Sequence, residues 1–236
     1  MANYSPKLIS IIIPVFNEEK TIKTIVDRVI KSNTLGIKKE IIIIDDGSTD
    51  GTKLLINNLK LKNIAVLTHK YNLGKGAAIR TGLKNANGNI LIIQDADLEY
   101  HPKEYPKLLK PFITQNAYVV YGSRELSGKN VHSSILFHAG GRLITIITNL
   151  LFNINLTDEA TGYKVFRKDV FSKFKLKCKG FEFCPEVTGK LLLNNFQIIE
   201  VPVTYSARHL HEGKKIKAID GLIAILTLLK VRFGLY

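Results

Sequence analysis

The chain is poor in cysteine and carries no pattern of a redox or zinc protein. Its two cysteines, Cys178 and Cys184, are too few for a disulfide framework, and no zinc-ligand spacing surrounds them. We interpret both as reduced core residues of a cytosolic protein. Residues 1–7 lead directly into a strand-like run, so we expect neither a secretory signal nor a transit peptide. The reaction is therefore expected in the cytosol or on a cytosolic membrane face.

The glycine-rich loops that often hold nucleotides are also missing. No GxxxxGK(S/T) run occurs, which excludes the P-loop class. The run Gly74-Lys75-Gly76 lacks the third glycine of a dinucleotide fingerprint and follows the third expected strand instead of the first. A hydride-transfer enzyme is therefore disfavoured, and a bound nucleotide must be held in another way.

A formal net charge of +14 is large for 236 residues. Anionic lipid, nucleic acid and phosphorylated substrates can all balance such a charge. Nucleic acid fits least, because no helix-turn-helix, zinc-finger or RNP-like pattern occurs and the lysines are spread along the whole chain. The alternative that needs no partner is a compositional bias towards Lys, Ile and Asn.

The order of apolar runs predicts an α/β fold with a mostly parallel sheet and flanking helices. An apolar content of 45% allows one sizeable core and hence a single domain. Strand-like and helix-like runs alternate, as in βαβ units, with no repeat or flexible linker. The expected strands span residues 8–13, 40–44, 64–67, 90–94 and 118–122, and the expected helices span 21–32, 50–62, 75–87 and a segment after Pro102.

Acidic pairs follow two of these strands. Asp45 and Asp46 close one strand, and Asp95 and Asp97 close another in the run DADLE. Ligands of open parallel sheets bind outside the carboxyl ends of the strands, so both pairs are expected to line one crevice. Carboxylates in this arrangement suit a hard divalent cation that also holds a diphosphate. The pattern indicates a nucleotide-sugar site.

Together, the motifs resemble glycosyltransferase family 2. They are the runs at residues 12–19 (IIPVFNEE), 45–52 (DDGSTDGT), 72–76 (NLGKG) and 95–97 (DAD). A narrower resemblance, to the dolichyl-phosphate mannose and glucose synthase branch, rests on residues 122–124 (GSR), 157–158 (TD), 161–167 (TGYKVFR) and 201–203 (VPV).

The resemblance implies a GT-A-like, Rossmann-related fold and a single glycosyltransferase domain. We expect a nucleotide-binding half at residues 1–125, an acceptor half at 126–213 and an amphipathic C-terminal helix at 214–236.

The family places its nucleoside at Asp45, with Pro14, Phe16 and Glu18 forming the rest of the pocket. We count Asp46 with this group, although Asp46, Ser48 or Asp50 could equally cap a helix N-terminus in the βα turn. Lys75 and Arg80 could add charge beside the diphosphate, or could simply lie on a helix surface.

Asp97 is the first choice for a ligand of Mg²⁺ or Mn²⁺. Asp95 lies two residues before it, and Glu99 could complete the coordination sphere or merely be solvated. The cation would neutralise the leaving diphosphate.

Residues 135–156 predict an unusual helix. A polar stripe, formed by His138, Arg142, Thr145, Asn149 and Asn153, runs through otherwise apolar surface. Because Gly140-Gly141 and Arg142 oppose a bilayer crossing, we expect a broken helix in the membrane interface, with its stripe turned to the active site. An ordinary core helix is the alternative.

Residues 214–233 predict a basic amphipathic helix. Ile219, Leu222, Ile223, Leu226 and Leu229 share one face, and Lys214, Lys217, Asp220, Thr227, Lys230 and Arg232 share the other. Such a helix suits an anionic membrane surface and predicts peripheral attachment, whereas packing on the sheet or on a second subunit is the alternative.

The resulting hypothesis is an inverting, metal-dependent transfer of a hexose from a nucleotide-diphosphate sugar to a polyprenyl or dolichyl phosphate. GDP-mannose and UDP-glucose both fit as donors, and no pattern indicates an oligomeric state. Arg124 and Arg142 are expected to clamp the acceptor phosphate, because guanidinium groups bind phosphate oxygens bidentately. Arg208 and Lys215 are weaker candidates for the same contact.

Two other hypotheses remain open. A family 2 enzyme could instead glycosylate a hydroxyl of a polysaccharide, lipid or peptide, and Asp158 would then be the general base. The chain could also be a non-catalytic subunit that binds a nucleotide sugar or a lipid phosphate, although the intact pair Asp95 and Asp97 disfavours this.

Overall fold

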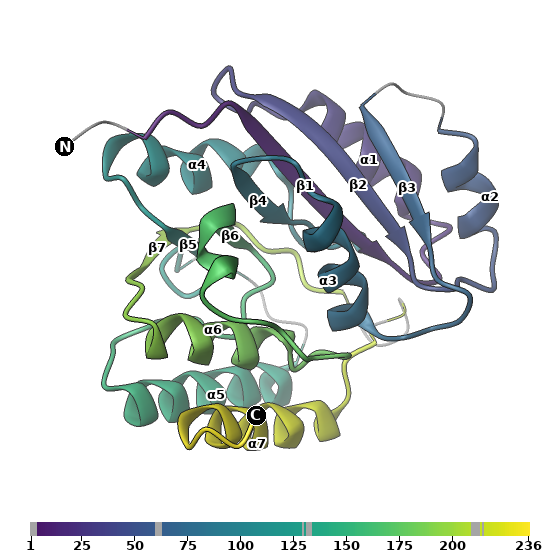
Figure 1. Cartoon of the computed structure of the whole chain (residues 1–236). Coiled ribbons are helices and arrows are strands. Elements are labelled where there is room, and N and C mark those ends of the chain that lie inside the picture. Colours follow the sequence, from purple (N-terminus) through teal and green to yellow (C-terminus); the bar gives the residue numbers. More distant parts are fainter. Residues whose placement is uncertain (1–3, 60–62, 129, 131–133, 209–212, 214) are drawn as a thin grey trace.

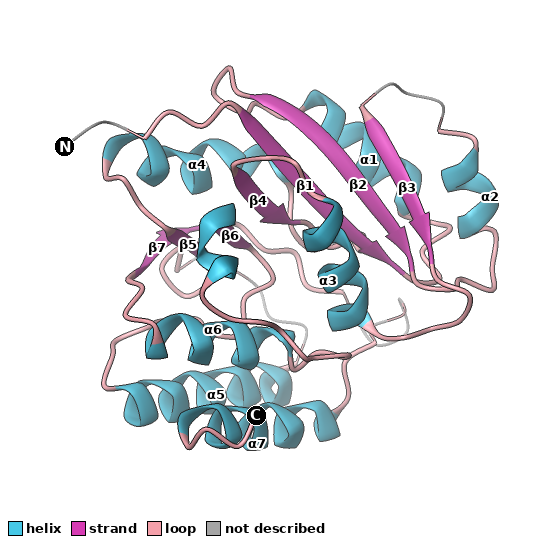
Figure 2. Ribbon diagram, viewed as in Figure 1, coloured by secondary structure: helices cyan, strands magenta, loops and turns pink. Residues whose placement is uncertain are grey.

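A computed structural model describes residues 4–59, 63–128, 130, 134–208, 213 and 215–236. One twisted sheet runs through the molecule, with helices on both of its faces (Figures 1 and 2). Its strands lie in the order β3-β2-β1-β4-β6-β5-β7, and β6 is antiparallel to both of its neighbours. The predicted α/β class with a mostly parallel sheet is confirmed.

The strands are β1 (Leu8–Val15), β2 (Lys38–Asp45), β3 (Ile64–Thr68), β4 (Ile90–Ile93), β5 (Val119–Ser123), β6 (Lys164–Arg167) and β7 (Ile198–Pro202). The α-helices are α1 (Ile22–Lys31), α2 (Thr52–Asn57), α3 (Lys75–Asn85), α4 (Tyr105–Thr114), α5 (Ile135–Phe152), α6 (Phe183–Leu193) and α7 (Ala218–Arg232). Short 3₁₀ helices lie at Pro102–Glu104 and Lys168–Ser172.

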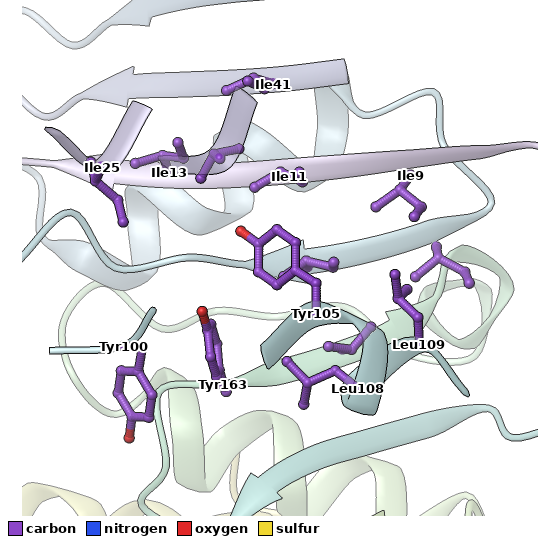
Figure 3. Packing of buried hydrophobic residues seen from close by; sticks show 14 of the residues in the cluster. Ile9, Ile11, Ile13, Ile25, Ile41, Tyr100, Tyr105, Leu108, Leu109 and Tyr163 are labelled. Carbon is purple, nitrogen blue, oxygen red and sulfur yellow. The ribbon is translucent and has the colours of Figure 1, made fainter. Parts of the chain in front are cut away.

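Alternation along β1 divides the core between the two faces of the sheet. Ile9, Ile11 and Ile13 point to the face covered by α1 and α4, and Figure 3 shows them above Tyr105 and Leu108 of α4. Ile12 points to the opposite face, where α3 and α6 pack. All four isoleucines are fully buried, and each contributes about 1.5–3 kcal/mol relative to an exposed side chain.

The chain order creates a crevice between β1 and β4. From β1 the chain builds β2 and β3 on one side, and it then crosses over to place β4 on the other side of β1. The loops that leave the carboxyl ends of β1 and β4 therefore diverge. This point is where open α/β sheets bind their ligands.

Several elements differ from the sequence prediction, most of them in the second half of the chain. Helix α2 ends at Asn57, earlier than the expected boundary before Asn63, and β6, β7 and α6 were not predicted as elements. Strand β6 has only four residues and begins with the buried Lys164, so it offers no apolar period to recognise. Helix α5 is continuous through Gly140-Gly141, and the expected break at these glycines is wrong.

Helices α5 and α7 form an outer layer beyond α6 (Figure 2). They meet through a small apolar cluster that includes Ile144, Ala224 and Leu228. Thr227, assigned from the sequence to the polar face of α7, is buried, because α7 presents that side to its neighbours. Lys214, assigned to the same face, lies outside the described residues.

Both outer helices leave large apolar side chains exposed. We call this surface the α5–α7 face; it comprises Leu136, Leu143, Ile146 and Leu150 of α5 and Ile219, Leu222, Ile223 and Leu226 of α7. Within the part of the chain that the structure describes, none of the helices combines the length and apolarity needed to cross a membrane.

Gly82 allows α3 to approach the sheet closely, which generates a stability prediction. A Cβ at Gly82 would lie 2.4 Å from Cγ2 of Ile12 and 2.9 Å from Cδ1 of Ile44. We expect Gly82→Ala to lower the free energy of unfolding by about 1–3 kcal/mol, as overpacking usually does. Denaturant titration measures the change.

Gly221→Ala in α7 is the matched control. A Cβ there meets nothing within 4 Å. Since alanine favours a helix over glycine, this variant should gain up to about 1 kcal/mol. Equal effects of the two substitutions would contradict the packing argument.

Candidate active site

The crevice gathers charged side chains from distant parts of the chain. Glu18 follows β1, Asp45 ends β2, and residues 95–100, called here the carboxylate loop, follow β4. Arg208, from the segment after β7, reaches both Glu18 and Asp97. Glu18 and Asp97, both predicted for the donor side, therefore come together around Arg208.

Each aspartate of the carboxylate loop faces a cation. Asp95 Oδ1 lies 2.6 Å from Nζ of Lys75, and Asp97 Oδ2 lies 3.4 Å from the Arg208 guanidinium. Burial, together with the charges of Asp95 and Glu99, raises the pKa of Asp97 to about 7. Within the described part of the chain, Lys75 and Arg208 are the cations that meet Asp95 and Asp97.

This donor set fits a divalent cation that arrives with a diphosphate. Among the described residues, no three His, Cys, Asp or Glu side chains converge as a metal site. Mg²⁺ usually takes only one or two carboxylates and completes its sphere with substrate phosphates and water. Asp97 and Asp95, both partly accessible, could supply those carboxylates.

Glu99 is oriented differently from its two neighbours. Its Oε2 accepts a hydrogen bond from the hydroxyl of Tyr205 at 3.0 Å, and its Oε1 accepts one from the backbone N–H of Arg208 at 2.8 Å. The sequence left a choice between a metal ligand and a solvated residue. The contacts favour neither, because Glu99 holds the segment after β7 against the loop.

Asp45 and Asp46 have contrasting surroundings. Asp45 Oδ1 accepts the backbone N–H of Ser48 at 3.0 Å, whereas its buried Oδ2 makes no hydrogen bond within the described structure. An unpaired buried carboxylate oxygen is costly and is typical of a ligand-binding position.

Both carboxylate oxygens of Asp46 form hydrogen bonds with the loop after β3. Its carboxylate lies 2.6 Å from Nδ1 of His69 and accepts the backbone N–H groups of Leu73 and Gly74 at 3.0 and 2.8 Å. These contacts favour a role in shaping the loop over direct substrate binding or helix capping. Asp50, by contrast, accepts from the backbone N–H of Thr52, near the start of α2, at 3.0 Å.

Glu18 joins the C-terminal segment to the donor side. It receives the Arg208 guanidinium at 3.2 Å on each oxygen and Nζ of Lys215 at 2.7 Å. Lys215 also donates to the backbone carbonyl of Phe16 and lies 5.8 Å from the centre of its ring. Arg208 and Lys215, weak candidates for an acceptor contact, therefore lie against the donor side.

Arg80 lies away from this charge cluster. Its guanidinium donates to the backbone carbonyls of Lys177 and Cys178 at 3.2 and 3.3 Å. It fixes the loop before α6 to α3. Of the two basic residues considered for the diphosphate, only Lys75 reaches the carboxylate loop.

A cavity with a volume of about 40 Å³ lies near the carboxylate loop, and Tyr205, which bonds to Glu99, forms part of its lining. It is lined by Arg124, Glu125, Ser134, Phe137, His138, Gly141, Arg142, Thr145, Thr157, Asp158 and Tyr205. Three of the five predicted members of the polar stripe of α5, namely His138, Arg142 and Thr145, thus line this cavity. Asn149 instead bonds the backbone of Leu156, and Asn153 ends the helix in a left-handed conformation.

Arg124 and Asp158 form a buried bidentate ion pair in this cavity. Nε and Nη2 of Arg124 donate to the two carboxylate oxygens at 2.7 Å each, and the backbone N–H of Arg124 adds a third bond at 2.9 Å. Burial alone would raise the pKa of Asp158, but Arg124 outweighs burial and the pKa is lowered. Asp158 is therefore a weak base.

Arg142 stands at the rim of the cavity and is more accessible. Its side chain is 62% exposed, and Nη1 lies 3.8 Å from the Glu125 carboxylate. Nε2 of His138 lies 2.9 Å from the same carboxylate. Glu125 thus anchors two cationic or hydrogen-bonding groups of α5 beside Arg124.

Sequence reasoning missed several residues that shape the site. Tyr205 connects the carboxylate loop with the cavity that contains Arg124. Its hydroxyl donates to Glu99, and its ring lies 5.2 Å from the guanidinium carbon of Arg124. Glu200 of β7 holds the backbone N–H groups of Thr157 and Asp158. Recognition of β7 as a parallel strand would have found both residues, since its carboxyl end joins the same edge of the sheet.

Comparison with known proteins defines the family. Residues 10–174 match Glycosyl transferase family 2. The chain is 30% identical to the UDP-N-acetylglucosamine–dolichyl-phosphate N-acetylglucosaminyltransferase of Methanococcus voltae, over 97% of each chain. It is 29% identical to the polyprenol monophosphomannose synthase of Mycolicibacterium smegmatis, over 86% of this chain and 79% of that protein.

The fold is shared with a solved enzyme. Glucosyl-3-phosphoglycerate synthase from Mycobacterium tuberculosis, in complex with Mn²⁺, UDP and glucosyl-3-phosphoglycerate, aligns with a TM-score of 0.69 and 21% identity, over 97% of this chain and 80% of that chain. The sheet and its flanking helices thus have a GT-A-like fold. The chain belongs to glycosyltransferase family 2.

Proposed function

We propose that this glycosyltransferase moves a hexose from a nucleotide-diphosphate sugar to a polyprenyl phosphate. The observation that carries the proposal is the Arg124–Asp158 pair, which places a guanidinium in the acceptor cavity and leaves Asp158 a poor base. Such a site suits an acceptor that is already an anion. Two relatives support the same acceptor class: the name of the M. voltae enzyme specifies dolichyl phosphate as its acceptor, and that of the M. smegmatis enzyme specifies a polyprenol monophosphomannose product.

On the donor side, the nucleoside would lie over Pro14 and Phe16 with its base or ribose donating to Asp45 Oδ2. Lys75 and Arg208 would face the diphosphate, and Asp97 with Asp95 would hold Mg²⁺ or Mn²⁺. The cation, when bound, would neutralise charge on the leaving diphosphate. The M. tuberculosis enzyme has been solved in complex with UDP and either Mn²⁺ or Mg²⁺, which supports this assignment.

On the acceptor side, Arg124 and Arg142 would hold the phosphate. A phosphate monoester loses its second proton near pH 6, so its oxygen needs no base at neutral pH. That oxygen would attack the anomeric carbon while the bond from this carbon to the nucleoside diphosphate breaks, with inversion. Residues 1–125 would serve the donor and residues 126–213 the acceptor, although Arg208 and Lys215 join the donor side.

A hydroxyl acceptor fits less well. Its proton must leave in the transition state, and an efficient general base has a pKa near the working pH. Asp158 has a lowered pKa and is committed to Arg124 through three hydrogen bonds.

The α5–α7 face would bring this site to an anionic membrane surface on the cytosolic side. The same helix, α5, carries Arg142 at the cavity and Leu143, Ile146 and Leu150 on its exposed side. Basic residues, including Lys217 and Arg232, flank the apolar residues of α7. A polyprenyl phosphate, with its charged head beside apolar chains, suits such a surface.

The metal assignment predicts opposite behaviour for two neighbouring acidic residues. Asp97→Asn should abolish Mn²⁺-dependent donor binding and turnover, because it removes a charged ligand, while circular dichroism remains native. Glu99→Gln should keep metal binding, since Glu99 contacts Tyr205 and Arg208. Isothermal titration with Mn²⁺ and a nucleotide sugar measures both, and full wild-type activity in chelator would sink the assignment.

The acceptor assignment predicts a selective effect of Arg142→Ala. Losing one charge-assisted contact of about 1.5–3 kcal/mol should raise the Michaelis constant for polyprenyl phosphate roughly 10- to 100-fold. Lys23→Ala, which removes an exposed charge from α1, should leave that constant unchanged. Initial rates with a polyprenyl phosphate and a nucleotide-sugar panel give the comparison.

Asp158→Asn separates the two acceptor classes. With a phosphate acceptor, the loss in turnover should stay well below the roughly 10²- to 10⁴-fold that a general base contributes. Activity confined to simple sugar acceptors, collapsing in Asp158→Asn and indifferent to Arg142→Ala, would establish the hydroxyl-acceptor alternative.

The membrane assignment predicts salt-sensitive binding to anionic liposomes. Each Lys or Arg near such a surface contributes about 1 kcal/mol, so sedimentation with vesicles should weaken as salt rises. Leu222→Asp with Leu226→Asp should abolish binding, whereas Leu54→Asp on α2, which is also exposed, should not. Equal partitioning to neutral and anionic vesicles at every ionic strength would contradict the charge argument.

A further inference from the structure

Gln94 is a buried amide placed directly before the carboxylate loop. It is fully inaccessible to solvent. Its Nε2 donates to the backbone carbonyls of Asp95 and Tyr100 at 3.0 and 3.3 Å. Its Oε1 accepts the hydroxyls of Tyr105 and Tyr163 at 2.8 and 2.9 Å. A side-chain amide has two N–H donors and an oxygen with two lone pairs, so Gln94 uses its whole capacity.

The two donor bonds join the ends of the carboxylate loop. Asp95 is the first residue of the loop and Tyr100 is the last, so the amide of Gln94 links the two ends of the loop through their backbone carbonyls. Leu98 within the loop adopts a left-handed conformation with φ of 66°, which is uncommon for a leucine. The backbone that carries Asp95 and Asp97 is therefore held in a bent shape by Gln94.

The two acceptor bonds fix the direction of the amide. Tyr105 is the first residue of α4, and Tyr163 directly precedes β6. Figure 3 shows the hydroxyls of these two tyrosines directed towards the same space, whereas the hydroxyl of Tyr100 points in another direction. Because both hydroxyls donate to the oxygen, the NH₂ group must face the loop. Gln94 thus connects the loop to both halves of the chain.

A contact of Tyr100 also restricts the position of the Asp95 carboxylate. The hydroxyl of Tyr100 accepts the backbone N–H of Gly162 at 3.0 Å. A Cβ at Gly162 would lie only 2.6 Å from Oδ2 of Asp95. The Asp95 carboxylate is therefore confined between Lys75 and the backbone at Gly162.

We infer that Gln94 is a positioning residue, which sets the spacing and direction of Asp95 and Asp97 towards the cation and diphosphate of the donor. The inference rests on the proposed function. A residue that merely stabilised the core would lower the melting temperature without changing how the folded protein binds a cation. Groups that orient metal ligands from behind usually change metal affinity by about 10- to 100-fold when they are removed.

The test is the affinity for Mn²⁺ in the presence of UDP and, separately, of GDP, followed by the paramagnetic resonance signal of free Mn²⁺. Gln94→Met keeps the length of the side chain and removes all four hydrogen bonds. Its apparent dissociation constant for Mn²⁺ should rise about 10- to 100-fold. In initial-rate assays its turnover number should fall, with the Michaelis constant for the lipid acceptor unchanged.

Tyr105→Phe is the matched control, because it removes one bond to Oε1 and leaves both N–H bonds to the loop. It should lower the melting temperature while its Mn²⁺ affinity stays within about twofold of wild type, well short of the change typical for metal-orienting groups. Equal losses of Mn²⁺ affinity in Tyr105→Phe and Gln94→Met would overturn the inference. If Gln94→Met fails to fold, Gln94→Glu, which keeps both tyrosine bonds but lacks the NH₂ group, is judged by the same criterion.

The outcomes separate this inference from the proposed function. If the wild-type protein fails to bind Mn²⁺ both in the presence of UDP and in the presence of GDP, the metal-dependent function is refuted. The positioning role of Gln94 is then refuted as well. If wild type binds Mn²⁺ and the Gln94 variant binds it equally well, only the positioning role is refuted.

Discussion

The arrangement of the site depends on one electrostatic constraint: the carboxylates that follow β1 and β4 are balanced by cations from distant segments. Glu18 pairs with Arg208 and Lys215. Asp95 pairs with Lys75, and Asp97 pairs with Arg208. The cations arrive from α3 and from the chain after β7. The same charges that could bind a donor thus also join the first and last parts of the chain.

This constraint explains the arrangement of the acceptor side. Tyr205 bonds to Glu99 and lies beside Arg124, so the segment that neutralises the donor side also forms a wall of the acceptor cavity. Glu200 holds Thr157 and Asp158, and Asp158 in turn holds Arg124. Strand β7 therefore supports the Arg124–Asp158 pair through Glu200, and the segment that follows β7 contacts both sides of the site through Tyr205.

The first five strands were predictable from sequence because each is an apolar run followed by a turn signal. The donor-side residues were predictable for the same reason, since parallel strands end at one edge. What escaped prediction depends on contacts between distant residues. Asp46 and Glu99 look like ligands in the sequence, yet backbone N–H groups or a tyrosine hydroxyl occupy their oxygens. No local pattern distinguishes them from Asp45 and Asp97.

Stability alone gives a poor reason for the charges inside this protein. A buried ion pair such as Arg124–Asp158 is often no more stabilising than apolar residues of similar volume, although removing one partner costs about 3–5 kcal/mol. Buried Gln94, equally, would be replaceable by an apolar side chain if its tyrosine partners changed with it. Both are explained more directly by what they orient. Arg124 is fixed towards the cavity proposed for the acceptor phosphate, and Gln94 is bonded to the loop whose two aspartates are proposed to hold a cation.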